Sequence, residues 1–202
     1  MSAANGWTAI IPFKPAGARK TRLAGRLTAA QRDGLSEAMF NHVARTLAAT
    51  PELGRVVLLS SIRPPGWAGE WLPDAGRGLN AELHHAAQAL GAANLLIIHA
   101  DLPFLTPADV SALIAAAADG CAIAPDRHGT GTNALALRDA AGFTFAFGAG
   151  SLQRHGAMAK ARARILARPG LSLDIDTQAD LDLAISQGLP VQLTPPGLGS
   201  FL

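Results

Sequence analysis

Short apolar segments of strand length alternate along this chain with longer segments of helical spacing, and this alternation limits the fold more than any other feature. Strands that are separated by helices are typical of a mostly parallel sheet with helices on both faces. The expected strands are residues 7–13, 55–60, 94–100, 121–125, 132–137 and 171–173. The expected helices are residues 28–49, 80–90, 106–119, 151–167 and a last one that begins at Thr177.

The pattern predicts an α/β protein, a single three-layer α/β/α domain that covers residues 1–202 without a dividing linker. Residues 62–78 are rich in proline and glycine and are expected to form one long loop, which in a compact domain is more often functional than idle. Residues 188–202 contain three prolines and three glycines, so we expect a tail that lies on the surface.

The composition excludes several classes of protein. With 49% hydrophobic residues and a formal net charge of +2, the chain does not belong with disordered proteins. Its apolar runs are far shorter than the roughly 18 residues of a membrane span. The one cysteine, Cys121, excludes a disulfide framework and a cysteine-based zinc site. The first six residues are small and polar rather than a leader, so we expect a cytoplasmic protein.

Charged side chains follow the expected strands at the edge where open parallel sheets bind ligands. The first strand is followed by Lys14, Arg19, Lys20 and Arg22, the central strand by Asp101, and the last strand by Asp174 and Asp176. Carboxylates hold a hard metal ion such as Mg²⁺, and cations neutralise phosphate oxygens, so the combination indicates a polyphosphate site. Each feature alone has a plainer interpretation: a solvated basic loop, a turn residue and capping acids. Together at the strand ends they favour the site.

Two glycine-rich segments, residues 129–133 and 147–151, form a second cluster. Such loops expose backbone N–H groups, and Ser151 opens a helix whose N-terminus attracts an anion. His155 follows on the same helical face, where it could meet the anion, although a surface histidine is the commoner case. Three further histidines, His84, His85 and His99, have no ligand spacing and are expected to be structural. The net charge is too small for an extended basic field, so no nucleic acid partner is expected.

Seven short segments in order along nearly the whole chain carry a resemblance to a known family: residues 11–15, 19–23, 78–80, 99–109, 124–133, 147–155 and 173–177. The chain resembles the 2-phospho-L-lactate guanylyltransferase family, which includes the bacterial phosphoenolpyruvate guanylyltransferases of coenzyme F(420) biosynthesis. It looks more distantly like the molybdenum-cofactor nucleotidyltransferases, but it has a lysine and arginine loop in place of their glycine-rich loop.

The resemblance implies a glycosyltransferase-A-like nucleotidyltransferase fold and a reaction of GTP with a phosphorylated three-carbon acid, which gives a guanylylated acid and pyrophosphate. It implies Mg²⁺ on Asp101, Asp174 and Asp176, and a catalytic set of Lys14, Lys20, Arg22 and Asp101, whose cations meet the triphosphate. It implies the nucleoside beside Gly78 and Asn80, and the acceptor's phosphate and carboxylate on Thr132 or Asn133, Gly148 and Ser151. No general base is needed, because the phosphate that attacks is already largely ionised at pH 7.

Several questions stay open at this level. Phosphoenolpyruvate, 2-phospho-L-lactate and 3-phospho-D-glycerate all present a phosphate and a carboxylate, so the sequence does not choose between these acceptors. A nucleotidyltransferase of the same fold with a sugar phosphate or molybdopterin acceptor is one alternative, and a non-catalytic nucleotide-binding domain is another. The oligomeric state is also open, a homodimer included.

Overall fold

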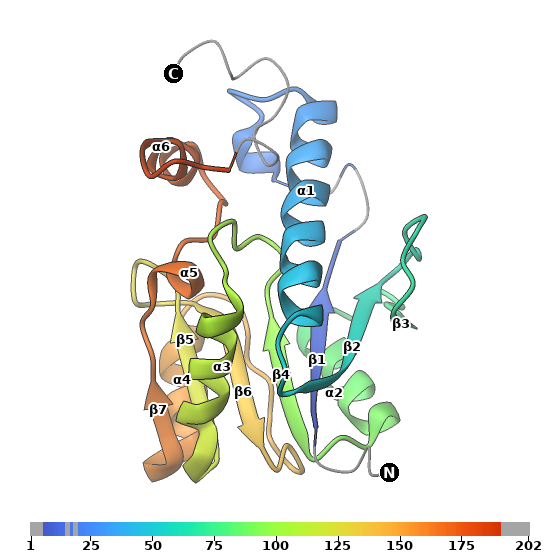
Figure 1. Cartoon of the computed structure of the whole chain (residues 1–202), viewed down its shortest axis with the longest axis vertical. Coiled ribbons are helices and arrows are strands. Elements are labelled where there is room, and N and C mark those ends of the chain that lie inside the picture. The colour runs from blue at the N-terminus through green and yellow to red at the C-terminus, as the bar shows by residue number, and fades with distance from the viewer. Residues whose placement is uncertain (1–5, 15–16, 18–19, 191–202) are drawn as a thin grey trace.

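The computed structural model describes residues 6–14, 17 and 20–190 (Figure 1). Within these residues, seven strands form one sheet in the order β3-β2-β1-β4-β6-β5-β7. The strands are β1 Trp7–Pro12, β2 Leu53–Ser60, β3 Glu70–Pro73, β4 Asn94–Ile98, β5 Cys121–Pro125, β6 Thr132–Arg138 and β7 Ala163–Ile165. β6 runs antiparallel to β4 and β5, and the other neighbouring strands are parallel. The expected mostly parallel sheet is confirmed.

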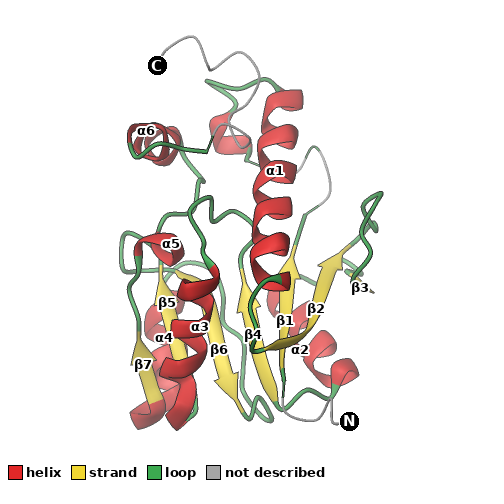
Figure 2. Ribbon diagram, viewed as in Figure 1, coloured by secondary structure: helices red, strands yellow, loops and turns green. Residues whose placement is uncertain are grey.

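Helices cover both faces of this sheet (Figure 2). They are α1 Ala29–Ala48, α2 Leu79–Leu90, α3 Pro107–Ala116, α4 Ser151–Ala159, α5 Pro169–Ser172 and α6 Gln178–Ser186, with the 3-10 turns η1 Thr21–Leu23, η2 Ala117–Asp119 and η3 Lys160–Arg162. α1 and α3 pack on one face and α2 and α4 on the other. These are the three layers that the sequence predicts.

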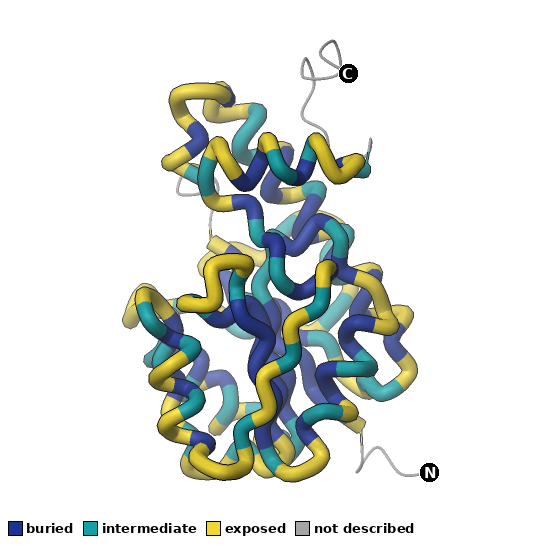
Figure 3. The backbone as a smooth tube through the Cα atoms, turned by 90° about the vertical axis from the view of Figure 1, so that its left-hand side faces the viewer, coloured by how far each residue is buried: buried dark blue, intermediate teal, exposed yellow. Residues whose placement is uncertain are grey.

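The core follows from the alternation of side chains along the central strands. In β1, Ile11 packs in the cluster under α1 and α3, whereas its neighbour Ile10 packs in the cluster under α2. Leu96 and Leu95 of β4 divide between the same two clusters. Figure 3 shows these strands as the buried centre between layers of helix. A strand buried on both faces must be apolar throughout, which is why β4 reads as a continuous apolar run.

A third apolar cluster lies beyond the carboxyl ends of β1 and β4, where α6 and the first half of α1 extend past the sheet (Figure 1). Leu23 of η1, Leu35 of α1 and Leu181 of α6 are buried in it, together with Ile175. This cluster therefore holds two loops in place, the one that carries Lys20 and the one that ends in Asp176.

The structure corrects two of the expected elements. The helix expected over residues 151–167 ends at Ala159, because Lys160 has a φ of +53°, and the strand β7 follows and pairs with β5. No strand forms over residues 171–173: Leu171 and Ser172 belong to the short helix α5, which begins at Pro169, and Leu173 follows it in extended conformation. Proline favours the first turn of a helix, since the N–H group that it lacks would have no helical partner there.

The long loop expected over residues 62–78 contains β3, an edge strand that pairs in parallel with β2. Trp67 and Trp71 of this segment pack against the main core. The expected tail lies outside the described residues except for 188–190. In the part of the chain that the structure describes, no helix combines the length and apolar character that a membrane crossing requires.

Candidate active site

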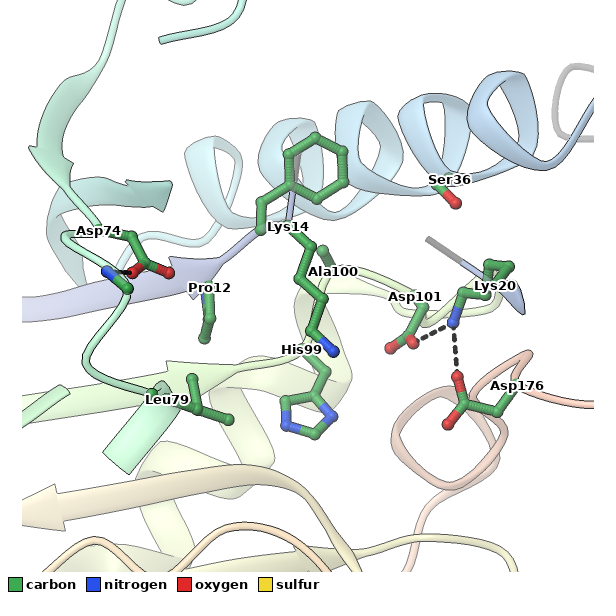
Figure 4. Close-up of a pocket in the computed structure, with 13 residues that line it drawn as sticks. Pro12, Lys14, Lys20, Ser36, Asp74, Leu79, His99, Ala100, Asp101 and Asp176 are labelled. Atoms are coloured by element: carbon green, nitrogen blue, oxygen red, sulfur yellow. Dashed lines mark hydrogen bonds and ion pairs between the residues drawn. The ribbon is translucent and has the colours of Figure 1, made fainter. Parts of the chain in front are cut away.

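A pocket of about 430 Å³ opens at the carboxyl ends of β1 and β4 (Figure 4). This volume is in the range of small-ligand sites, and the place is where open α/β sheets bind their ligands. Pro12, Phe13 and Lys14 line the pocket from the end of β1, and His99, Ala100 and Asp101 line it from the end of β4. The rest of the lining comes from Lys20, Ser36, Asp74, Gly76, Gly78, Leu79 and Asp176.

Three carboxylates meet at one end of the pocket. Asp101, Asp174 and Asp176 each place an oxygen within 4.8 Å of the others'. Lys20 Nζ donates to Oδ2 of Asp101 and, over 2.8 Å, to Oδ1 of Asp176 (Figure 4). Only 8% of the Lys20 side chain is exposed, whereas half of the Asp176 side chain is exposed. Oδ1 of Asp101 is buried and has no hydrogen-bond partner among the described residues.

The three carboxylates carry more negative charge than the Lys20 ammonium balances, and this excess affects their pKa values. Burial, together with the charges of Asp101 and Asp176, raises the pKa of Asp174 to about 7. Burial acts on Asp101 in the same direction, but the Lys20 ammonium outweighs it and holds the pKa of Asp101 below its usual value. Burial lowers the pKa of Lys20, yet the two carboxylates more than offset it, so Lys20 stays protonated. The pair Lys20–Asp101 is therefore ionic.

The extended segment after α5 delivers the second and third carboxylates. Ile175 is fully buried in the third apolar cluster, and its N–H donates to the carbonyl oxygen of Asp101 over 3.3 Å. The N–H of Asp176 donates to Oδ2 of Asp180, which also receives the Thr177 N–H at the start of α6. Because alternate side chains of an extended chain share a side, burying Ile175 leaves Asp174 and Asp176 together on the other side.

Asn133 of β6 connects the glycine-rich cluster to these carboxylates. Its buried amide Nδ2 donates to the carbonyl oxygens of Leu171 and Ser172, over 3.0 and 3.1 Å, and to Oδ1 of Asp174 over 3.2 Å. The resemblance implies that Thr132 or Asn133 contacts the acceptor. In the structure the Asn133 amide supports the turn that presents Asp174.

His155 is not the surface histidine that the sequence favours. It is fully buried, because α4 turns this side chain toward Phe143 and Phe147. The N–H of Ala146 donates to Nε2 of His155 over 3.0 Å, so the proton is on Nδ1, which donates to Thr132 Oγ1 over 3.0 Å. Burial, with a smaller effect of Arg154, lowers the pKa of His155 to about 4.

This buried histidine predicts a pH dependence of stability. The unfolded chain binds a proton on His155 below about pH 6.5, whereas the folded protein does so only near pH 4, so stability is lost as the pH falls between these values. Between pH 7 and pH 5 the loss should be on the order of 2 kcal/mol. Urea unfolding at both pH values should show the full loss in the wild-type protein and in His85→Gln, an exposed control, and a clearly smaller loss in His155→Gln. A part remains in that variant because burial also lowers the pKa of His99. Equal losses in all three proteins would contradict this role of His155.

The expected nucleoside residues stand at the start of α2. Gly78 lines the pocket and has a φ of +92°, a conformation that favours glycine. The Asn80 side-chain amide makes two hydrogen bonds to the backbone of Phe147. Its Oδ1 accepts the Phe147 N–H over 2.8 Å, and its Nδ2 donates to the Phe147 carbonyl oxygen over 3.2 Å. Asn80 therefore ties α2 to the segment that leads to Gly148 and Ser151, of which Gly148 is exposed and Ser151 is buried at the first turn of α4.

The four expected cations divide into separate groups. Lys14 and Lys20 line the pocket, the first exposed and the second buried between carboxylates. Arg22 lies in η1, is exposed, and is not among the residues that line the pocket. Arg19 lies outside the described residues.

Sequence reasoning missed three polar side chains of the pocket, Ser36, His99 and Asp74. His99 stands two residues before Asp101 at the end of β4, a spacing that could have indicated the shared side of the chain. Burial lowers the pKa of His99, so its imidazole is neutral at pH 7. Asp74 stands in the long loop, and only its position directly after the edge strand β3 could have indicated it.

Comparison with known proteins assigns the family. Residues 7–189 match the family described as guanylyl transferase CofC like. The chain belongs to this family. It is 40% identical over 189 residues to a phosphoenolpyruvate guanylyltransferase of Sphaerobacter thermophilus, covering 86% of this chain and 90% of that protein. A phosphoenolpyruvate guanylyltransferase of Rubrobacter xylanophilus is 37% identical over 190 residues, with 86% and 90% covered.

Solved structures show the same fold at low sequence identity. A nucleotidyl transferase of Methanothermobacter superposes with a TM-score of 0.64 at 16% identity, covering 91% of this chain and 97% of that one. The 4-diphosphocytidyl-2C-methyl-D-erythritol synthase of Anaerococcus prevotii superposes with a TM-score of 0.59 at 13% identity, with 91% and 96% covered. The expected nucleotidyltransferase fold is confirmed, and family membership makes the chain a nucleotidyltransferase of the guanylyl class.

Proposed function

We propose that this guanylyltransferase transfers GMP from GTP to the phosphate of phosphoenolpyruvate and releases pyrophosphate, in the biosynthesis of coenzyme F(420) in the cytoplasm. The observation that carries the proposal is the cluster of three carboxylates around Lys20 at the end of a nucleotide-sized pocket. The names of the relatives support the acceptor. The acids 2-phospho-L-lactate and 3-phospho-D-glycerate carry the same two anionic groups, and we retain them as alternative acceptors.

The cluster fits a magnesium ion. Mg²⁺ takes oxygen ligands, and Asp101, Asp174 and Asp176 offer three of them within 4.8 Å, with one buried oxygen of Asp101 unpartnered among the described residues. Burial and, after it, the charges of Asp101 and Asp176 raise the pKa of Asp174, and a divalent cation would neutralise these charges. When bound there, Mg²⁺ would supply charge stabilisation for the phosphates between which the reaction takes place.

Lysine side chains of the protein would neutralise the negative charge of the triphosphate that the metal ion does not. The Lys20 side chain is buried beside the cluster and stays protonated, so its ammonium is available to oxygens of the triphosphate. Lys14 reaches the same pocket from the end of β1 (Figure 4). An oxygen of the acceptor's phosphate attacks the α-phosphorus of GTP, and the bond from that phosphorus to the leaving pyrophosphate breaks. The attacking oxygen is already ionised, so the residues' task is to hold two anions in line.

The start of α4 is the place that we propose for the acceptor. The N-terminus of a helix attracts an anion, and Gly148 and Ser151 stand there. Two consecutive residues of β6 join this place to the carboxylates, because Thr132 bonds to His155 on α4 and Asn133 bonds to Asp174. An acceptor phosphate at the start of α4 is thereby held at a defined position relative to the carboxylate cluster.

The proposal is tested with the purified protein, GTP, Mg²⁺ and a panel of the three acids. Pyrophosphate release is followed continuously, and ³¹P NMR follows the new phosphoanhydride directly, since the product can be labile. We expect the fastest release with phosphoenolpyruvate, and none above background without an acid. Release that is equally fast without any acid, or with a sugar phosphate alone, would contradict the proposal.

A further inference from the structure

Asp74 stands at the opposite end of the pocket from the carboxylate cluster (Figure 4). Between the two ends lie Pro12 and Leu79, and Leu79 is one of the few large apolar side chains that are exposed, at 38%. A carboxylate at the edge of an apolar slot matches an aromatic base, whose faces are apolar and whose edge carries hydrogen-bonding groups.

Hydrogen bonds to β2 and α2 hold the loop that carries Asp74. Asp74 N–H donates to the carbonyl oxygen of Ser60 over 3.0 Å, and Oδ1 of Asp74 accepts the N–H of Gly76 over 2.8 Å. The buried carboxylate of Glu82, on α2, accepts the N–H groups of Ala75 and Arg77, both over 2.9 Å. A side chain on a backbone fixed in this way is pre-organised, so binding orders little of the chain.

The free direction of the carboxylate faces the pocket. Figure 4 shows Oδ1 of Asp74 turned to the backbone nitrogen of Gly76 and the second oxygen turned toward the interior, on the side of Pro12. Each carboxylate oxygen has two lone-pair directions, so Oδ1 can accept a second hydrogen bond beside the one from Gly76. Both oxygens of Asp74 are thus acceptors for a ligand that offers two parallel donors.

We propose that Asp74 is the residue that selects guanine, by accepting the N1–H and the 2-amino group of the base. This inference rests on the proposed function, in which a guanine nucleotide fills the pocket with its phosphates at Lys20. Guanine presents two adjacent donors on this edge, whereas adenine presents one donor beside an acceptor. A carboxylate bonded to both donors therefore favours GTP and leaves ATP with an acceptor facing an acceptor.

Asp74→Asn tests the assignment, because its amide oxygen can still accept the Gly76 N–H and keep the loop. The affinities of GTP, ATP, ITP and XTP are measured by calorimetry with Mg²⁺ and without acceptor acid. In the wild-type protein, ITP, which lacks the 2-amino group, should bind more weakly than GTP. In Asp74→Asn, GTP affinity should fall roughly 10- to 100-fold, ATP should change little, and XTP, whose C2 carbonyl suits the new amide, should gain.

Asp139→Asn is the matched control. Asp139 also accepts an N–H two residues ahead, that of Ala141 over 3.3 Å, and it lines a different hollow beside Phe143 and Phe145. This variant should keep the wild-type order of affinities. An equal loss for GTP and ATP in Asp74→Asn would overturn the inference in favour of a bond to the ribose, and an unchanged GTP affinity would overturn it outright.

Failure of this inference and failure of the proposed reaction give different results. A wild-type protein that prefers GTP and loses this preference in Asp74→Asn, yet releases no pyrophosphate with any acid, would keep the inference and overturn the reaction. A wild-type protein that releases pyrophosphate with phosphoenolpyruvate, and whose preference for GTP survives in Asp74→Asn, would do the reverse.

Discussion

Asp101→Asn should lower the rate of pyrophosphate release roughly 1,000-fold while leaving the fold intact. The substitution removes one negative charge from the three-carboxylate cluster, at the residue whose second oxygen is buried without a partner among the described residues. The amide is the same size as the carboxylate, and its oxygen can still accept from Lys20, so the packing at the end of β4 should survive. Initial rates with GTP and phosphoenolpyruvate measure the effect, and circular dichroism checks the fold.

Calorimetric titration with Mn²⁺, as a substitute for Mg²⁺, separates the metal role of Asp101 from a purely positional one. Asp101→Asn should bind the ion at least about tenfold more weakly, because it lacks one of three anionic ligands. Asp119→Asn is the control, since Asp119 is exposed and pairs with Arg164 outside the residues that line the pocket. Near-normal pyrophosphate release by Asp101→Asn would rule out the assigned site.

Lys20→Met should lower kcat/KM for GTP roughly 100- to 1,000-fold and also destabilise the protein by about 2 to 3 kcal/mol. The catalytic loss follows from removing an ammonium that is buried beside the carboxylates, where a charge acts more strongly than in water. The loss of stability follows because Asp101 would keep a buried charge without its partner. We place it below the usual cost of breaking a buried pair, because half of Asp176 is exposed and screened by water.

Steady-state kinetics and urea unfolding measure the two effects of Lys20→Met separately. Added Mg²⁺ should raise the stability of this variant more than that of the wild-type protein, because Asp101 and Asp176 then lack the ammonium group with which they pair. Lys160→Met is the matched control, since Lys160 is exposed in η3 and is the third lysine of the chain. Unchanged GTP kinetics in Lys20→Met would remove this lysine from the catalytic set.

Much of the fold was predictable because its signals are local. A continuous apolar run such as β4 reports burial on both faces, and the capping box of Thr28 and Gln31 marks the start of α1 within four residues. The short elements β3, β7 and α5 were not predictable in this way. Each has four residues or fewer, so its state depends on the neighbour with which it pairs or packs rather than on its own pattern.

In the candidate site, too, some features follow from local signals and others depend on distant neighbours. Positions after expected strands, together with the family resemblance, indicated Asp101, Asp174 and Asp176, and the structure brings their oxygens together although a short helix precedes Asp174. No local signal could show that His155 is buried. Its side chain contacts Phe143, Phe147 and Thr132 of β6, which lie outside α4 and reach it only in the folded protein. Helical spacing reports only which side of α4 the residue occupies.

By itself the sequence determined the α/β class, the family, and the residue types that can hold a metal ion and a polyphosphate. The tertiary structure decided how those residues are used. It buried Lys20 between Asp101 and Asp176, turned Asn133 toward Asp174, and set Asp74 at the far end of the same pocket. The physical reason is that residue type and local periodicity follow the chain, whereas ion pairing, burial and the shape of a pocket depend on segments that meet only after the sheet has formed.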